Sequence, residues 1–217
     1  MNGRVLQDPV GLRPMPRLVI VYHDPGDPEG HLMVERLLER VCKGVGLTEC
    51  TKTPISEVEE GKASFSKDDL VYALFLGRGG HFETVKEAVY KAGARLLGSI
   101  PPRLVAEALA PTLKGCKSVD LAYWPAKRFV ERHMADLEEA RRALEKALGV
   151  PVRLRSKCEG CNADCIVGYT LMPGRLSRKV ESLKDRAKAS YLLPYLEGPL
   201  VEYVEKLVEE ALGTGRS

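Results

Sequence analysis

Two histidines, each placed after a predicted strand, are the residues of this sequence best suited to binding a metal ion. His23 directly follows the apolar run at 18–22, and His81 lies five residues beyond the run at 70–76. Short apolar runs indicate buried parallel strands, and ligands bind at the carboxyl ends of such strands. If the two strands are neighbours, both imidazoles overhang one edge, where they suit cobalt, nickel, iron or zinc. A hydrogen-bonding role in a turn is the alternative for either histidine alone.

The loop before His81 has features that favour a flat, acidic ligand. Gly79 and Gly80 carry no side chain, so a ligand can approach their backbone closely. Arg78 precedes them, and its guanidinium can bind a carboxylate through two parallel hydrogen bonds. His31 and His133 lie in or beside predicted helices among charged neighbours, and we interpret both as surface residues.

Three cysteines form a second candidate site. Cys158, Cys161 and Cys165 lie within eight residues, a density typical of zinc or iron–sulfur ligands. A fourth ligand is then needed, and the candidates are a side-chain oxygen, a second subunit, Cys116, Cys50 or Cys42. A disulfide and free thiols are the alternatives. Taken individually, Cys42 and Cys116 are interpreted as small apolar residues.

The same cysteines lie in a short connection. About nine residues (156–164) join the second and third strands of the second half, whereas about seventeen (53–69) do so in the first half. A parallel crossover usually needs a dozen or more residues. A metal or disulfide staple could therefore hold the shortened connection.

Alternating strands and helices predict an α/β fold with parallel sheets covered on both faces. Strands are expected at 18–22, 70–76, 94–100 and 118–124. Helices are expected near 83–91, from Pro102 through Leu109, and after the first strand, with one apolar face formed by Met33 or Val34, Leu37, Leu38 and Val41.

The second half of the chain repeats the order of the first. Residues 164–176 align with residues 69–81 at a constant offset of 95, which pairs Gly174 with Gly79. After a one-residue slip, residues 191–201 align with residues 95–105. These matches predict two similar flavodoxin-like lobes related by internal duplication.

The two lobes differ where chemistry is expected. His23 falls opposite Trp124, and His81 falls opposite Leu176, so only the first lobe has the imidazole pair. The predicted parts are an irregular N-terminal arm at 1–17, a first lobe at 18–115 and a second lobe, with the cysteine cluster, at 116–217.

Composition excludes several classes of protein. The net charge of +3 is too small, and the basic residues too evenly interleaved with acidic ones, for a nucleic-acid-binding footprint. No apolar stretch is long enough for a membrane helix and no secretory signal is visible, so we expect a cytoplasmic protein. Charged residues make up 29%, a richness found in thermophile proteins. The sequence also lacks the phosphate-binding motif of ATP-dependent enzymes.

Taken together, the sequence resembles the class II tetrapyrrole metal chelatases, particularly the long form of the sirohydrochlorin cobaltochelatase family. The resemblance rests on the segments VIVYHDPGDP, ALFLGRGGHFETV and LLGSIPPRLVAEAL, and it extends over nearly the whole chain from Leu18. Long-form members are two fused halves with the active-site histidines in the first. The chain differs at the first histidine, where family members usually have Gly-His-Gly-Ser and this sequence has Tyr-His-Asp-Pro.

The resemblance implies ATP-independent insertion of a divalent cation into a sirohydrochlorin-type tetrapyrrole, a step of cobalamin biosynthesis. Cobalt is the expected metal, with nickel or iron as alternatives. His23 and His81 would bind the incoming metal and help to remove pyrrole protons, and Glu83 would accept a proton or simply favour the start of a helix. Arg78 and Arg175 would bind substrate carboxylates.

Two other functions remain open at this point. The first is a carrier of metal or tetrapyrrole on the same scaffold, without catalysis. The second is a thiol-based redox or iron–sulfur protein in which the cysteine cluster is the active group.

Overall fold

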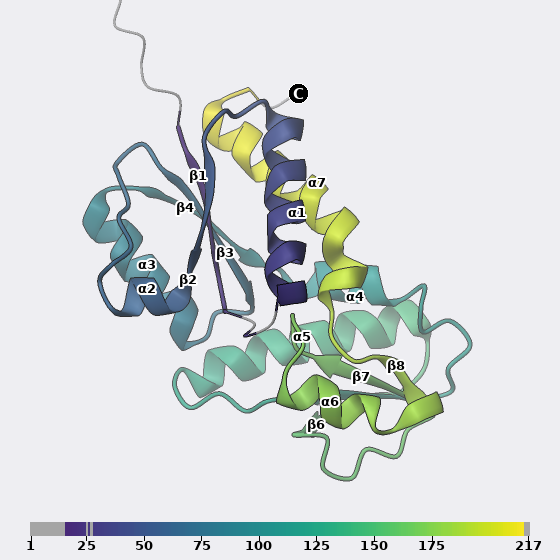
Figure 1. The fold of residues 1–217 in the computed structure, drawn as a ribbon. Helices are drawn as coiled ribbons and strands as arrows, with labels where there is room; N and C mark the ends of the chain where they lie inside the picture. The colour runs from purple at the N-terminus through teal and green to yellow at the C-terminus, as the bar shows by residue number, and fades with distance from the viewer. Residues whose placement is uncertain (1–15, 25, 27, 215–217) are drawn as a thin grey trace, which may run out of the picture.

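The computed structural model describes residues 16–24, 26 and 28–214, which form two four-stranded parallel sheets (Figure 1). The strand orders are β2-β1-β3-β4 and β6-β5-β7-β8. The predicted α/β fold of two similar lobes is confirmed, as is the expected pairing of the first strand with the third. Most of the predicted arm, residues 1–15, lies outside the described residues. Within those residues, no helix has the length and apolar character needed to cross a membrane.

The first lobe follows the order expected from its apolar runs. It comprises β1 (Leu18–Tyr22), α1 (Pro28–Val45), β2 (Cys50–Pro54), α2 (Ile55–Glu59), β3 (Leu70–Leu76), α3 (Gly80–Ala92), β4 (Arg95–Ile100) and α4 (Pro102–Leu109). All five residues of β1 are buried, as its unbroken apolar character predicts. Helix α3 begins three residues earlier than expected, because the chain turns into the helix directly after Gly79. His81 therefore lies in the first turn of a helix, and not in the loop before it.

The second lobe has the same order of strands, with a shorter connection between β6 and β7. It comprises β5 (Val119–Tyr123), α5 (Val130–Leu148), β6 (Val152–Ser156), β7 (Cys165–Tyr169), α6 (Arg175–Glu181), a short 3₁₀ helix (Lys184–Arg186), β8 (Ala187–Ala189) and α7 (Leu193–Leu212). The first lobe places α2 between its second and third strands, whereas no helix occupies the equivalent connection here.

Strand register supports the internal duplication. Leu18 pairs with Leu70 in the first sheet, and Val119 pairs with Cys165 in the second. The partners on the third strands, 70 and 165, are 95 residues apart, which is the offset expected from the sequence. The predicted alignment of residues 191–201 with residues 95–105 is wrong, because β8 ends at Ala189 and residues from Leu193 onward are helical. Helix α6 has 7 residues whereas α3 has 13, so this part of the repeat has a different length in the two lobes.

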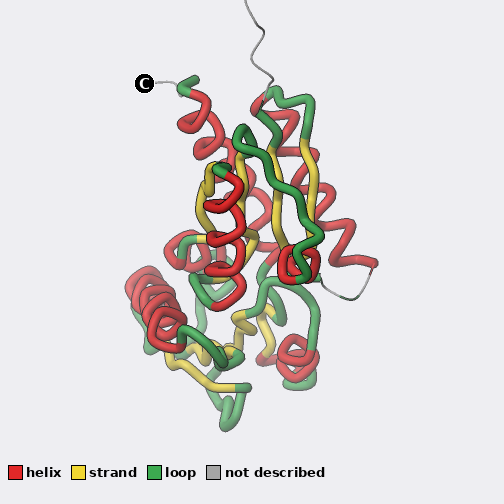
Figure 2. The backbone as a smooth tube through the Cα atoms, turned by 90° about the vertical axis from the view of Figure 1, so that its left-hand side faces the viewer, coloured by secondary structure: helices red, strands yellow, loops and turns green. Residues whose placement is uncertain are grey.

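The two lobes share one hydrophobic core because each sends its last helix to the other. Helix α7 leaves the second sheet and runs beside α1 on one face of the first sheet (Figure 1). In turn, α4 of the first lobe packs against α5 of the second. The tube view shows the strands of the two sheets in separate parts of the molecule, with helices packed around both (Figure 2). One large cluster of buried residues therefore spans both lobes, from Leu18 and Leu37 to Leu121 and Val204, and each lobe also has a smaller cluster of its own. This shared core fixes the orientation of one lobe against the other.

Candidate metal-binding site

The two predicted histidines meet at the carboxyl edge of the first sheet. His23 follows β1, His81 lies in the first turn of α3, and their ring centroids are 5.3 Å apart with the planes inclined at 76°. The pairing of β1 with β3 brings them together, since parallel neighbours end at the same edge. Both side chains are accessible to solvent. The sequence-based prediction of a histidine pair at this edge agrees with this geometry.

A glutamate that the sequence analysis did not single out completes the cluster. Glu59, the last residue of α2, lies 3.0 Å through its Oε1 from Nδ1 of His81. Helix α2 follows β2, which pairs with β1 as β3 does. The segments after β2, β1 and β3 therefore contribute Glu59, His23 and His81, respectively. Its segment contains Glu57, Glu59 and Glu60, and nothing in their spacing shows which one turns toward the histidines.

Hydrogen bonding leaves the same nitrogen of each imidazole available. Nδ1 of His23 lies 3.1 Å from the backbone oxygen of Asp24, and Nδ1 of His81 faces the Glu59 carboxylate. Both partners are acceptors, so each neutral ring carries its proton on Nδ1. Each Nε2 then has an unshared electron pair. A carboxylate behind a ligating imidazole is the usual support of histidine metal ligands.

A second network lies beside the pair and holds the first histidine's loop. The Tyr22 hydroxyl lies 3.0 Å from Nδ1 of His31, and Nε2 of His31 lies 3.2 Å from Oδ1 of Asp24. Burial and the negative charge of Asp24 raise the pKa of Tyr22, so this hydroxyl stays protonated and donates to His31. The His31 side chain is 37% exposed, as expected for a surface residue, and these two contacts anchor it. It lines an open depression of about 640 Å³ with Asp24 and Glu35.

Arg78 joins the two lobes. Its Nη2 lies 2.7 Å from Oδ1 of Asp136 on α5, and its backbone N–H donates to Oδ2 of the same carboxylate at 2.7 Å. Asp136 is almost fully buried, whereas the Arg78 side chain is 57% exposed. Both residues line an interlobe cleft of about 260 Å³, together with Glu139 and the end of β4. Arg78 thus combines a structural ion pair with a surface that a ligand can still reach.

The remaining predicted site residues occupy different positions around the histidines. The Glu83 carboxylate is 14% exposed and forms ion pairs with Arg132 of the second lobe and with Lys86. Gly79 has open space where a side chain would be, and Gly80 faces Arg128 of the second lobe. Arg175 is an exposed first residue of α6. Of the two glutamates Glu59 and Glu83, Glu59 lies within hydrogen-bond distance of His81, whereas Glu83 is paired with Arg132 and Lys86.

Solved structures provide the comparison that decides the fold. No family model and no curated protein matches the chain. The sirohydrochlorin chelatase SirB from Bacillus subtilis subspecies spizizenii, in complex with cobalt, aligns over 91% of this chain and 97% of its own, with TM-score 0.62 and 16% identity. SirB from Bacillus subtilis with Fe³⁺ aligns over 91% of this chain and 98% of its own, with TM-score 0.61 and 14% identity. CbiX, the terminal enzyme of siroheme biosynthesis in denitrifying bacteria, aligns over 93% of this chain and 100% of its own, with TM-score 0.57 and 17% identity. This chain has the sirohydrochlorin chelatase fold.

The cysteine cluster is not a single site within this chelatase fold. Cys158 pairs with Cys161, whereas Cys165 pairs with Cys116 ahead of β5. The metal-cluster prediction is therefore wrong, because all these sulfurs are in disulfides and none is a thiolate ligand. Asp164 lies beside Cys116 and Cys165, but that sulfur pair is oxidised as well.

The interpretation of the two other cysteines as isolated apolar residues is also wrong. Cys42 of α1 is bonded to Cys50 of β2, and Cys116 to Cys165 of β7. Every cysteine in the described part of the chain is thus in a disulfide. The alternative of a disulfide staple for the short connection is the one that the structure supports.

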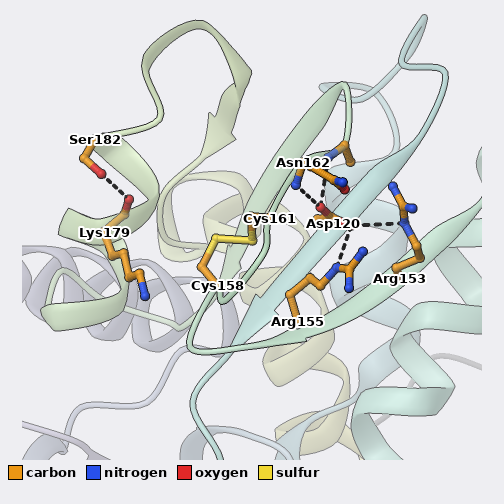
Figure 3. The surroundings of a disulfide bond; sticks show 9 residues. Asp120, Arg153, Arg155, Cys158, Cys161, Asn162, Lys179 and Ser182 are labelled. Carbon is orange, nitrogen blue, oxygen red and sulfur yellow. Dashed lines mark hydrogen bonds and ion pairs between the residues drawn. A yellow bond between two sulfur atoms is a disulfide. The ribbon is translucent and has the colours of Figure 1, made fainter.

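A buried aspartate holds the same connection from inside (Figure 3). Asp120 of β5 is fully buried and accepts the backbone N–H groups of Asn162 and Ala163 at 2.7 and 2.9 Å. Arg153 and Arg155 of β6 form ion pairs with it. Burial alone would raise the pKa of Asp120, but these hydrogen bonds and the arginine charge together hold that pKa below its usual value. The connection between β6 and β7, which has no counterpart of α2, is therefore held by the Cys158–Cys161 disulfide and by the hydrogen bonds to Asp120.

Proposed function

We propose that this protein inserts a divalent metal ion, cobalt in the first instance, into a sirohydrochlorin-type tetrapyrrole without ATP. One observation carries the proposal: the His23 and His81 rings lie 5.3 Å apart at the open edge of a sheet, in the same fold as sirohydrochlorin chelatases. Fold alone does not assign an activity, so the proposal depends on the chemistry of these side chains.

The incoming metal is the substrate that these imidazoles are suited to receive. The neutral form of each imidazole has a free electron pair on Nε2, and imidazole is a suitable ligand for first-row divalent metals such as iron, cobalt, nickel and zinc. Two imidazoles occupy only part of a coordination sphere, so ring nitrogens of the tetrapyrrole can take the remaining positions. Weak, incomplete binding by the protein allows the metal to leave with the product.

Insertion also releases two pyrrole protons, and the site has an acceptor for them. The His81 imidazole is hydrogen-bonded to Glu59 at 3.0 Å. Once the metal has moved from Nε2 of His81 to the ring nitrogens, that Nε2 is free to accept one pyrrole proton, and the Glu59 carboxylate stabilises the resulting imidazolium by charge. Solvent reaches both groups, since their side chains are about half exposed. The proton therefore passes from the site to water.

The exposed cations around this edge suit an acidic macrocycle. Arg78 keeps an accessible surface despite its ion pair, and Arg175 is exposed at the equivalent loop of the second lobe. Gly79 and Gly80 leave the intervening backbone open to a flat ring. We assign carboxylate binding to the arginines and close backbone approach to the glycines.

The test is an anaerobic spectrophotometric assay of cobalt insertion into sirohydrochlorin. His23→Ala and His81→Ala should each lose turnover by at least about a hundredfold, and Glu59→Gln by about tenfold to a hundredfold. Glu60→Gln is the matched control, because Glu60 belongs to the same segment but pairs with Lys62.

Calorimetric titration with cobalt separates metal binding from catalysis. Weaker cobalt binding in the two histidine variants, with normal binding in Glu60→Gln, is the expected pattern. Wild-type protein that binds cobalt and sirohydrochlorin without turnover would overturn the proposal and favour a carrier.

A further inference from the structure

An unusual concentration of exposed apolar side chains lies on the second lobe, where the first lobe has its histidines. Among the described residues, the exposed large hydrophobic side chains are Leu32, Tyr90, Trp124, Phe129 and Val130. Trp124, Phe129 and Val130 belong to one short segment that follows β5. The Trp124 side chain lies next to the end of β5, at the position that His23 occupies after β1, and is 46% exposed. Exposed apolar groups gathered in this way indicate a binding surface.

Cations accompany these rings. Nζ of Lys157 lies 5.9 Å from the centroid of the Trp124 ring, and Cζ of Arg128 lies 5.5 Å from the Phe129 centroid. Arg132 approaches the Phe129 ring at 5.8 Å and also forms an ion pair with Glu83. We call Trp124, Arg128, Phe129 and Lys157 the aromatic–cationic surface. An aromatic ring with positive charges beside it matches a flat ligand with carboxylates at its rim.

One end of the aromatic–cationic surface, at Arg128, lies against the segment of the first lobe that carries His81. A side-chain carbon built on Gly80 would lie 3.7 Å from Cβ of Arg128, so the two loops are in van der Waals range. The ion pair between Arg132 and Glu83 joins the same two segments, and Glu83 is two residues from His81. A ligand that reaches the Arg128 end of this surface is therefore close to the segment that carries His81.

The surface is also held in place before any ligand arrives. The backbone oxygen of Trp124 lies 3.3 Å from Nε2 of His133, and the backbone N–H of Lys157 donates to the Tyr123 oxygen at 2.7 Å. Lys157 immediately precedes Cys158, whose disulfide closes the short turn that presents the lysine. A preformed surface loses less conformational entropy on binding than a mobile one does.

From these observations, and on the basis of the proposed function, we infer that the aromatic–cationic surface is the platform for the tetrapyrrole. Trp124 stacks against the flat macrocycle, Phe129 adds apolar contact, and Arg128 and Lys157 bind carboxylates at its rim. The first lobe then supplies the metal through its histidines. This division explains why the second lobe, which has no imidazole at these positions, keeps an exposed tryptophan there.

The test measures binding of sirohydrochlorin to metal-free protein from the macrocycle's visible absorbance. Trp124→Ala should raise the dissociation constant about tenfold, because stacking on one aromatic ring contributes roughly this much. Trp124→Phe should stay within about threefold of wild type, since it keeps a ring. Cobalt affinity, titrated separately, should be the same in all three proteins.

Matched controls separate this platform from general surface effects. Tyr90→Ala removes the most exposed of the large hydrophobic side chains, at 87%, from the distant end of α3 and should leave binding unchanged. Lys157→Gln should weaken binding and reduce its dependence on salt, whereas Lys206→Gln on α7 should do neither.

The outcomes distinguish this inference from the proposed function. If wild type has normal turnover and Trp124→Ala binds sirohydrochlorin as tightly as wild type does, the platform inference is wrong. The chelatase proposal would then remain intact. Wild-type protein that fails to bind sirohydrochlorin at all would overturn the proposed function itself. Weaker binding in Trp124→Ala, rescued in Trp124→Phe with cobalt affinity unchanged, is the result expected here.

Discussion

Removal of the disulfide between Cys116 and Cys165 should destabilise this protein more than removal of either other disulfide. Cys116 precedes β5, and Cys165 is the first residue of β7, the strand that pairs with β5 in the second sheet. The bond closes a segment with a sequence separation of 49, whereas Cys158 and Cys161 are separated by only 3. A longer closed segment restricts the unfolded chain more strongly.

Chain entropy gives the expected magnitudes. For a separation of 49 the unfolded chain loses entropy equivalent to about 4 kcal/mol at 25 °C. The same relation gives about 1.6 kcal/mol for the Cys158–Cys161 bond, whose separation is 3. The Cys42–Cys50 bond, with a separation of 8, falls between them at about 2.5 kcal/mol. The two extreme cases thus differ by about 2.5 kcal/mol, which is well within reach of measurement.

The assay is urea unfolding of two double variants, Cys116→Ala with Cys165→Ala and Cys158→Ala with Cys161→Ala, under non-reducing conditions. Wild-type protein with a dithiol reductant provides the fully reduced reference. The first variant should lose about 4 kcal/mol and the second about 1.6 kcal/mol. Equal losses in the two variants would refute the loop-closure argument. Six titratable thiols in unreduced, unfolded wild type would refute the disulfides themselves.

Three further perturbations test the framework of the site. Asp120→Asn should cost about 1–3 kcal/mol at pH 7. Because the folded-state pKa of Asp120 is lowered, this stabilisation is present above about pH 4 and is lost as pH falls through that folded pKa, so urea unfolding should show a smaller difference at pH 3. Gly77→Ala should lower the melting temperature more than Gly61→Ala does, as measured by thermal unfolding. Both glycines have positive φ, but only a Cβ on residue 77 would lie 3.0 Å from the Asp136 side chain. Gly168→Ala should yield little folded protein, judged by circular dichroism, because its Cβ would lie 2.1 Å from a backbone oxygen.

Local sequence was sufficient to predict β1 and β3 and to place the two histidines after them. The runs at 18–22 and 70–76 are apolar throughout, and both are strands with those same bounds. A buried parallel strand is encoded by its own side chains, so a histidine placed after it is also placed at the sheet edge. The offset of 95 was visible for the same reason, since it pairs strand with strand and loop glycine with loop glycine.

Glu59 could not be chosen from the sequence, because selecting one of three nearby glutamates requires the direction in which α2 turns. The cysteine pairings were equally hidden: Cys165 is near Cys161 along the chain, but the strand it begins carries it to Cys116. Side-chain partners of this kind depend on contacts between segments that are distant in sequence.

The apposition of the two lobes is the feature that only tertiary packing decides. The exchange of α4 and α7 buries apolar faces of both lobes, and in the assembled fold Arg128 lies beside Gly80 in the segment that carries His81. The apolar pattern of a helix shows that one face must be buried, but it does not show against which partner. The local sequence therefore encodes the position of each histidine after its strand, whereas the packing of Arg128 against Gly80 exists only once the shared core has formed.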